Sequence, residues 1–163
     1  MVWHVLQTQT MTTTANYTIQ PISAETAAAL ITGQGEICIA DTSPGYPCRR
    51  CLRDAALGDE VVLVSYTPFD LESPFRSASP IYLHTTPCQP DTGNPSPPVQ
   101  LTSRHLAVRV YDDHEMLIDS ALISGEELDE TLERLFENES ADLLRIYNAS
   151  HGCWAANVHR SSR

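Results

Sequence analysis

Short apolar runs that follow one another through tight turns limit the fold of this chain more than any other feature. Runs rich in β-branched residues and bounded by Gly or Pro predict strands. The predicted strands cover residues 36–40, 61–66, 81–85, 106–111, 116–123, 143–148 and 153–159. The last four form two pairs, each joined by a polar turn that is typical of a hairpin. The sequence therefore predicts a largely antiparallel sheet.

Two segments have the pattern of a helix. Ser23 is placed to cap a helix over residues 24–31, which Gly33 would end. Ser124 and Glu127 form a capping box before a second helix. The apolar stripe of this second helix consists of Leu128, Leu132, Leu135 and Phe136. With the strands, these helices predict an α+β fold, a single domain with a largely antiparallel β-sheet and two main helices.

The composition fits one compact domain, because 163 residues with 42% hydrophobic content can bury a core of their own. We expect this domain to span residues 17–163. Residues 1–16 are polar and rich in Thr and Gln, and Met11 is a second methionine. We interpret this segment as a disordered leader or as a start site assigned too early.

The charge balance excludes several functions. The net charge is −11, and all ten basic residues are arginine. A chain without lysine has no Schiff-base lysine and no phosphate-loop lysine. An acidic surface repels nucleic acid and anionic membranes, so we expect neither as a partner. With no membrane span or secretory signal in the sequence, we expect a cytoplasmic protein. Self-association into a homo-oligomer stays open, and other partners are unknown.

The pair Cys48 and Cys51, separated by two arginines, is the most reactive pattern in the chain. Two thiols at this spacing can chelate a metal, form a reversible disulfide or act as a redox pair. Prolines and Gly45 predict a turn into the pair, and residues 48–56 have the pattern of a brief helical turn. In a reducing cytoplasm, cysteines are more typical of metal ligands, redox thiols or buried apolar residues than of structural disulfides.

Zinc is the first candidate ligand of this pair. A tetrahedral zinc site needs four thiolate or imidazole ligands, and C-x-x-C spacing supplies two from one turn. His84 with Cys88, or His151 with Cys153, could complete the set. The predicted metal ligands are therefore Cys48, Cys51, His84, Cys88 and Cys153.

Two other interpretations of the pair stay open. In a small thiol-disulfide oxidoreductase, Cys48 would be the nucleophile and Cys51 the resolving thiol, because a helix N-terminus and nearby arginines favour a thiolate. A thioredoxin-like arrangement is disfavoured, since Gly58 follows Cys51 by about seven residues, too few for a crossover helix. Alternatively, the cysteines only pack as small apolar side chains.

A third hypothesis is ligand binding without catalysis. Strand alternation places Arg109 on one face with Tyr111, and Arg145 on one face with Tyr147. If these strands are neighbours, Arg109, Tyr111 and Arg145 could bind a carboxylate or phosphate. The competing interpretation is that these residues face solvent on a one-sided sheet.

Four blocks of the sequence resemble an uncharacterised bacterial family, known only as domain of unknown function 1203. The blocks are residues 45–52, residues 79–84 with Cys88, residues 109–112 and residues 151–153. The resemblance covers most of the chain from about Ile19 onward. It implies no activity, and it draws attention to Cys48, Cys51, His84, Cys88 and Cys153 without giving them a role.

The sequence favours a structural or binding role for a site centred on Cys48 and Cys51, with zinc as the candidate ligand. A thiol-disulfide oxidoreductase and an anionic-ligand binding protein are the alternatives. Common catalytic signatures such as G-x-S-x-G, H-E-x-x-H and Gly-rich phosphate loops do not occur, so no reaction is assigned.

Overall fold

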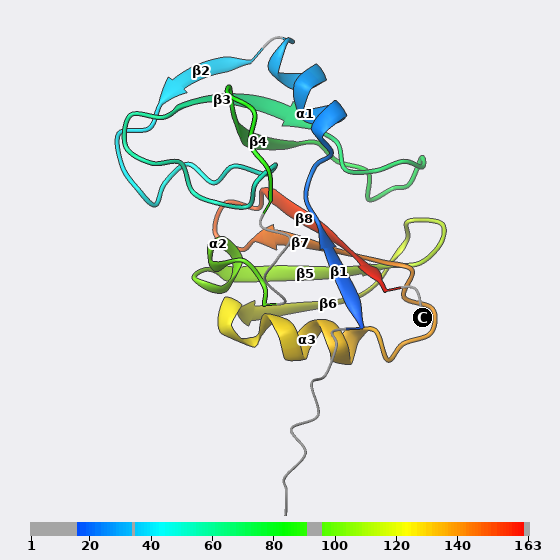
Figure 1. The fold of residues 1–163 in the computed structure, drawn as a ribbon. Helices are drawn as coiled ribbons and strands as arrows, with labels where there is room; N and C mark the ends of the chain where they lie inside the picture. Colours follow the sequence, from blue (N-terminus) through cyan, green and yellow to red (C-terminus); the bar gives the residue numbers. More distant parts are fainter. Residues whose placement is uncertain (1–15, 34, 91–95, 162–163) are drawn as a thin grey trace, which may run out of the picture.

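The computed structural model describes residues 16–33, 35–90 and 96–161, which form two antiparallel sheets (Figure 1). The larger sheet has the strand order β1-β8-β7-β5-β6. Its strands are β1 Tyr17–Gln20, β5 His105–Tyr111, β6 Leu117–Ser124, β7 Leu143–Asn148 and β8 Trp154–Arg160. The smaller sheet has the order β2-β3-β4, with β2 Glu36–Ile39, β3 Glu60–Tyr66 and β4 Ser79–His84.

The helix of residues Leu128–Leu135 covers one face of the larger sheet. The helical elements are α1 Ala24–Ile31, α2 Val99–Thr102, the 3-10 turn η1 Gly125–Glu127, and α3 Leu128–Leu135. The predicted capping box of Ser124 and Glu127 is present at the N-terminus of η1. The apolar stripe of α3 packs on alternate side chains of β5 and β7, such as Val108 and Ile146. Burial of each large apolar side chain contributes about 1.5–3 kcal/mol, so this layer is a main source of stability.

The opposite face of the larger sheet packs against the smaller sheet. Tyr147 and Trp154 from the larger sheet join Val62 and Leu83 from the smaller sheet in one buried cluster, to which α1 adds Ala27. In Figure 1, α1 with the smaller sheet, the larger sheet and α3 follow one another from top to bottom. Polar side chains between the two sheets are therefore removed from bulk water.

The predicted α+β class, with largely antiparallel strands and two main helices, is confirmed, and the strands form two sheets. The predicted hairpins are β5–β6 and β7–β8, and both pair as expected. The short elements β1 and α2 were not predicted. The brief helical turn predicted within residues 48–56 is present only as one turn, closed by the Leu52 N–H that donates to the Cys48 carbonyl. The bridges of Pro47 to Asp54 and of Cys48 to Tyr82 keep the chain extended on either side of it.

The extent of the domain over 17–163 stays a prediction, and the leader proposed for residues 1–16 lies almost wholly outside the described residues. In the described part of the chain, no helix has the length and apolar character that crossing a membrane requires.

Candidate metal centre

The cysteine pair lies in a loop of residues 44–56, here named the cysteine loop, which has no regular secondary structure beyond two isolated bridges. An antiparallel bridge joins Pro47 to Asp54 and closes the loop, and a parallel bridge joins Cys48 to Tyr82 in β4. The Cys48 N–H donates to the Arg53 carbonyl at 3.0 Å. The loop is therefore fixed at its base and laid against the last residues of β4.

Leu52 takes a left-handed backbone conformation directly after the pair, with φ of 55°. A non-glycine residue in this region costs about 1–3 kcal/mol and keeps the conformation only where its surroundings enforce it. The Leu52 side chain is buried, and its N–H donates to the Cys48 carbonyl at 3.1 Å. The strain is thus held in place by packing and by the turn that brings Cys51 back toward Cys48.

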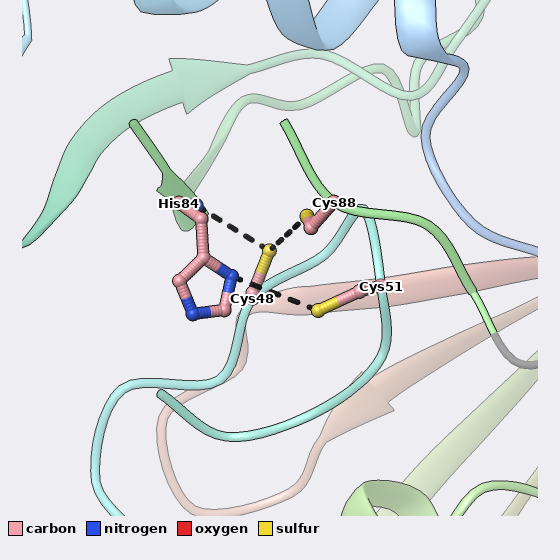
Figure 2. Close-up of side chains that lie close together, drawn as sticks. All are labelled: Cys48, Cys51, His84 and Cys88. Carbon is pink, nitrogen blue, oxygen red and sulfur yellow. Dashed lines mark hydrogen bonds between the residues drawn. The ribbon is translucent and has the colours of Figure 1, made fainter. Parts of the chain in front are cut away.

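Cys48, Cys51, His84 and Cys88 form one cluster, named here the cysteine cluster (Figure 2). Their possible ligand atoms all lie within 4.8 Å of one another. Cys48 Sγ is 3.8 Å from Cys88 Sγ, and Cys51 Sγ is 3.6 Å from His84 Nδ1. The sulfur–sulfur distance is far longer than the roughly 2.05 Å of a disulfide, so the thiols are free. Three sulfurs and one imidazole nitrogen are a donor set that a soft metal ion prefers.

Asp59 orients the imidazole of His84. His84 Nε2 lies 3.4 Å from Asp59 Oδ2, on the opposite side of the ring from the sulfurs. The same carboxylate oxygen accepts the Ala56 N–H at 2.9 Å, which fixes the carboxylate. A proton held on Nε2 leaves the Nδ1 lone pair facing the cluster, which is the arrangement found around metal-bound histidines. The sequence analysis missed Asp59, because only the pairing of β3 with β4 places it beside His84.

The thiols influence one another strongly. A hydrogen bond from the Cys51 thiol lowers the pKa of Cys48 to about 4, and backbone N–H groups of Cys51, His84 and Arg50 add to this against the effect of burial. The pKa of Cys51 is raised, first by its bond to Cys48 and then by burial. Burial and the Cys48 charge raise the pKa of Cys88 to about 11. Without a cation, the cluster therefore holds one thiolate, whereas a bound cation would allow all three sulfurs to ionise.

A family model described as "Protein of unknown function (DUF1203)" matches residues 45–160 of the chain. The match covers well over half of the sequence and includes the whole cysteine cluster. The chain belongs to the DUF1203 family. Comparison with curated proteins and with solved structures gave no match. The family description supplies no activity, so the function of this DUF1203 chain has to be argued from its own geometry.

Two tethers outside the cluster hold the cysteine loop in this DUF1203 domain. Buried Arg49 donates from Nη1 to Gln100 Oε1 at 2.7 Å, and Gln100 Nε2 donates to the Cys48 carbonyl at 3.3 Å. Arg104 pairs with Asp54 at 2.6 Å. Both partners lie in or just after α2, a short element that the sequence analysis missed. The tethers set the position of the loop before any ligand is present.

Cys153 and His151 are not part of the cluster. Both lie at the turn between β7 and β8, where the Cys153 thiol donates to the His151 carbonyl at 3.8 Å and His151 is exposed. Of the two pairs that could complete the donor set, the structure brings His84 and Cys88 to Cys48 and leaves this one apart. The described residues contain one other possible donor group, formed by Asp112, Asp113 and His114 at the β5–β6 turn. That group is largely exposed, as acidic turn residues commonly are.

Arg109, Tyr111 and Arg145 do lie together on the face of the larger sheet that meets the smaller sheet, and Arg109 is directly opposite Arg145. Arg145 is buried and forms an ion pair with Glu115. Its guanidinium stacks 3.9 Å from the ring centre of Phe69 and 4.6 Å from that of Tyr111. We name Arg145, Glu115, Phe69 and Tyr111 the Arg145 cluster. Glu115 occupies one edge of the guanidinium, whereas Nε and Nη1 have no hydrogen-bond partner in the described residues. Binding of an anionic ligand by Arg109, Tyr111 and Arg145 stays a prediction.

Proposed function

We propose that this chain is a zinc-binding domain in which Cys48, Cys51, His84 and Cys88 hold the ion as a structural cross-link. The observation that carries the proposal is the pair of ligand separations, 3.8 Å between two sulfurs and 3.6 Å between sulfur and nitrogen. A tetrahedral zinc ion with bonds of about 2.3 Å to sulfur and about 2.05 Å to nitrogen would separate such ligands by about 3.8 and about 3.6 Å.

The position of the cluster supports a structural role. The four residues come from the cysteine loop, from the end of β4 and from the segment that follows β4. An ion shared by them would join these segments where regular secondary structure is sparse. Four protein ligands also fill a tetrahedral shell, whereas catalytic zinc keeps one position for water or substrate.

Burial favours this role over thiol-disulfide turnover by the Cys48 and Cys51 pair. Cys48 is 0% exposed and Cys51 2% exposed. A nucleophile that exchanges disulfides with other proteins has to be reached by their sulfur atoms. The lowered pKa of Cys48 suits a metal ligand equally well, because the thiolate is the form that binds metal.

The test is the metal content of full-length protein purified without an affinity tag or chelator and kept under reducing conditions. We expect about one zinc ion per chain and a free energy of unfolding that falls by more than about 5 kcal/mol after the zinc is chelated. Cys51→Ser should lose the metal, and Cys153→Ser, as the matched control, should keep it. A parent protein that unfolds identically with and without chelator, and that carries no metal, would refute the proposal.

A further inference from the structure

The four proposed ligands differ in their access to solvent. Cys48 and Cys51 are buried, whereas Cys88 is partly exposed. A pocket of about 470 Å³ lies beside the cluster, and its lining includes Cys88, His84 and Thr86. A small oxidant that enters this pocket meets the Cys88 sulfur before it meets either of the other two.

The Cys88 Sγ atom lies 3.8 Å from the Cys48 Sγ atom. A disulfide requires about 2.05 Å, so the sulfurs would have to approach by a little under 2 Å. Cys88 lies beyond the end of β4, in a segment without regular secondary structure. The hydrogen bonds between the strands of the sheet therefore do not hold Cys88 back from this movement. Cys48, in contrast, is fixed by its bridge to Tyr82.

We propose that Cys88 is an oxidation site, at which a peroxide converts the cysteine cluster to a Cys48–Cys88 disulfide and releases the metal. This proposal rests on the zinc function proposed above and adds a means of regulating it. It differs from the oxidoreductase hypothesis, in which Cys48 and Cys51 react with each other and turn over.

The chemistry proceeds in two steps. The Cys88 sulfur attacks one peroxide oxygen, so that an S–O bond forms, the O–O bond breaks and hydroxide leaves with the bonding electrons. The Cys48 sulfur then attacks Cys88, so that the S–S bond forms and the S–O bond breaks with loss of a second hydroxide. The two sulfurs lose two electrons and the peroxide gains them. Only Cys51 and His84 would remain as ligands, too few to retain zinc.

The experiment treats zinc-loaded, full-length protein with hydrogen peroxide and follows released zinc with a coloured chelator. The disulfide is then mapped by mass spectrometry after alkylation and tryptic digestion. Because the only basic residues are arginines, trypsin cuts after Arg49, Arg50 and Arg76 and separates Cys48, Cys51 and Cys88 into different peptides. A Cys38→Ser background removes the one other cysteine that shares the Cys48 peptide.

We expect one zinc released per disulfide formed, with Cys48 linked to Cys88, and recovery of zinc binding after reduction by a thiol. Cys88→His keeps four nitrogen or sulfur ligands and should bind zinc but release it at least about tenfold more slowly. Cys153→Ser, a partly exposed cysteine outside the cluster, should release zinc at the parental rate.

The outcomes separate this proposal from the zinc proposal. Zinc that stays bound while peroxide leaves Cys88 unmodified would overturn the oxidation site and leave the zinc site standing. A Cys48–Cys51 disulfide with Cys88 still free would do the same. Purified parent protein that never contains or binds zinc would overturn both.

Discussion

The cysteine cluster and the Arg145 cluster both bury polar side chains near the junction of the two sheets, but they differ in how their charges are balanced. In the Arg145 cluster, Glu115 accepts from Arg145 and from the backbone N–H groups of Asp70 and Leu71. Two aromatic rings cover the guanidinium faces. The opposite charges of Arg145 and Glu115 thus pair within the chain, although Nε and Nη1 of Arg145 are buried without a hydrogen-bond partner in the described residues.

The cysteine cluster has no such internal balance. Its three thiols and one imidazole face one another, and the nearest carboxylate, Asp59, contacts the far side of the imidazole. Ionised sulfurs would need a positive charge. Burial raises the pKa of Cys88 by more than the charge of Arg50 lowers it, and the hydrogen bonds of Arg49, Arg50 and Arg53 in the described residues go to oxygen atoms, not to these sulfurs. A buried polar cluster therefore indicates an external ligand when its ionised groups lack partners of opposite charge within the chain, whatever its degree of burial.

Of the substitutions that test this comparison, Glu115→Gln should have the largest effect, which is on the free energy of unfolding. Without the carboxylate, the charge of Arg145 stays buried and uncompensated, which should lower the free energy of unfolding by about 3–5 kcal/mol. Metal content should not change, because Glu115 lies outside the cysteine cluster. Chemical denaturation and metal analysis on the same sample measure both quantities.

The matched control for this variant is the double substitution Glu115→Gln with Arg145→Met. Removal of both charges should restore a large part of the lost stability, since an apolar replacement of a buried pair is often close to neutral. If the double variant is less stable than Glu115→Gln alone, the two residues do not act as a balanced pair and the contrast between the clusters fails.

The second effect is the pH dependence of zinc binding. The pKa of Cys48 lies near 4, so this thiol is ionised at pH 8, whereas the raised pKa values of Cys51 and Cys88 keep these two protonated. Both must lose a proton to bind zinc, so affinity should rise with pH, by about 100-fold per pH unit between about pH 7.5 and 9. Calorimetry in buffers of different ionisation enthalpy should therefore count two released protons per zinc, and a count of three would contradict the internal stabilisation of the Cys48 thiolate.

The smallest effect concerns Asp59, which contacts the imidazole of His84 from outside the cysteine cluster. Asp59→Asn removes the carboxylate that contacts His84 Nε2, and it should lower zinc affinity by about 10–100-fold. With saturating zinc, the unfolding midpoint should stay close to the parental value. Asp113→Asn is the matched control, because Asp113 pairs with exposed His114 at 2.6 Å away from the cluster. Equal losses of affinity in the two variants would remove Asp59 from any positioning role.

Much of the fold could be predicted because its signals are local. The capping box at Ser124 and Glu127, the apolar stripe of α3 and the turns of two hairpins all depend on residues close in sequence. The strand β1 escaped prediction because four residues show too little alternation, and its pairing partner β8 is more than 130 residues away. The helical turn predicted within residues 48–56 is limited to residues 48–52, because the bridge of Cys48 to the distant Tyr82, which local patterns do not reveal, determines the shape of the loop.

The site could be predicted only in part for the same reason. The spacing of Cys48 and Cys51 indicated two donors, but the choice between the pairs His84 with Cys88 and His151 with Cys153 depends on which strand meets the loop. The grouping of Arg109 and Arg145 followed from strand alternation. Their surroundings did not, because the segment that carries Phe69 and the turn that carries Glu115 converge only in the folded chain.

The tethers of the cysteine loop have a consequence for engineering. Arg53 donates to the Gln89 carbonyl at 3.3 Å, and Arg49 donates to Gln100 at 2.7 Å. The cysteine loop therefore contacts the chain at Gln89 and again at Gln100 in α2. Doubling the length of a segment whose ends are anchored in this way costs only about 0.6 kcal/mol of closure entropy. A fluorescent peptide or an affinity epitope inserted directly after Pro97, ahead of α2, should therefore lie near the proposed metal centre without displacing its ligands.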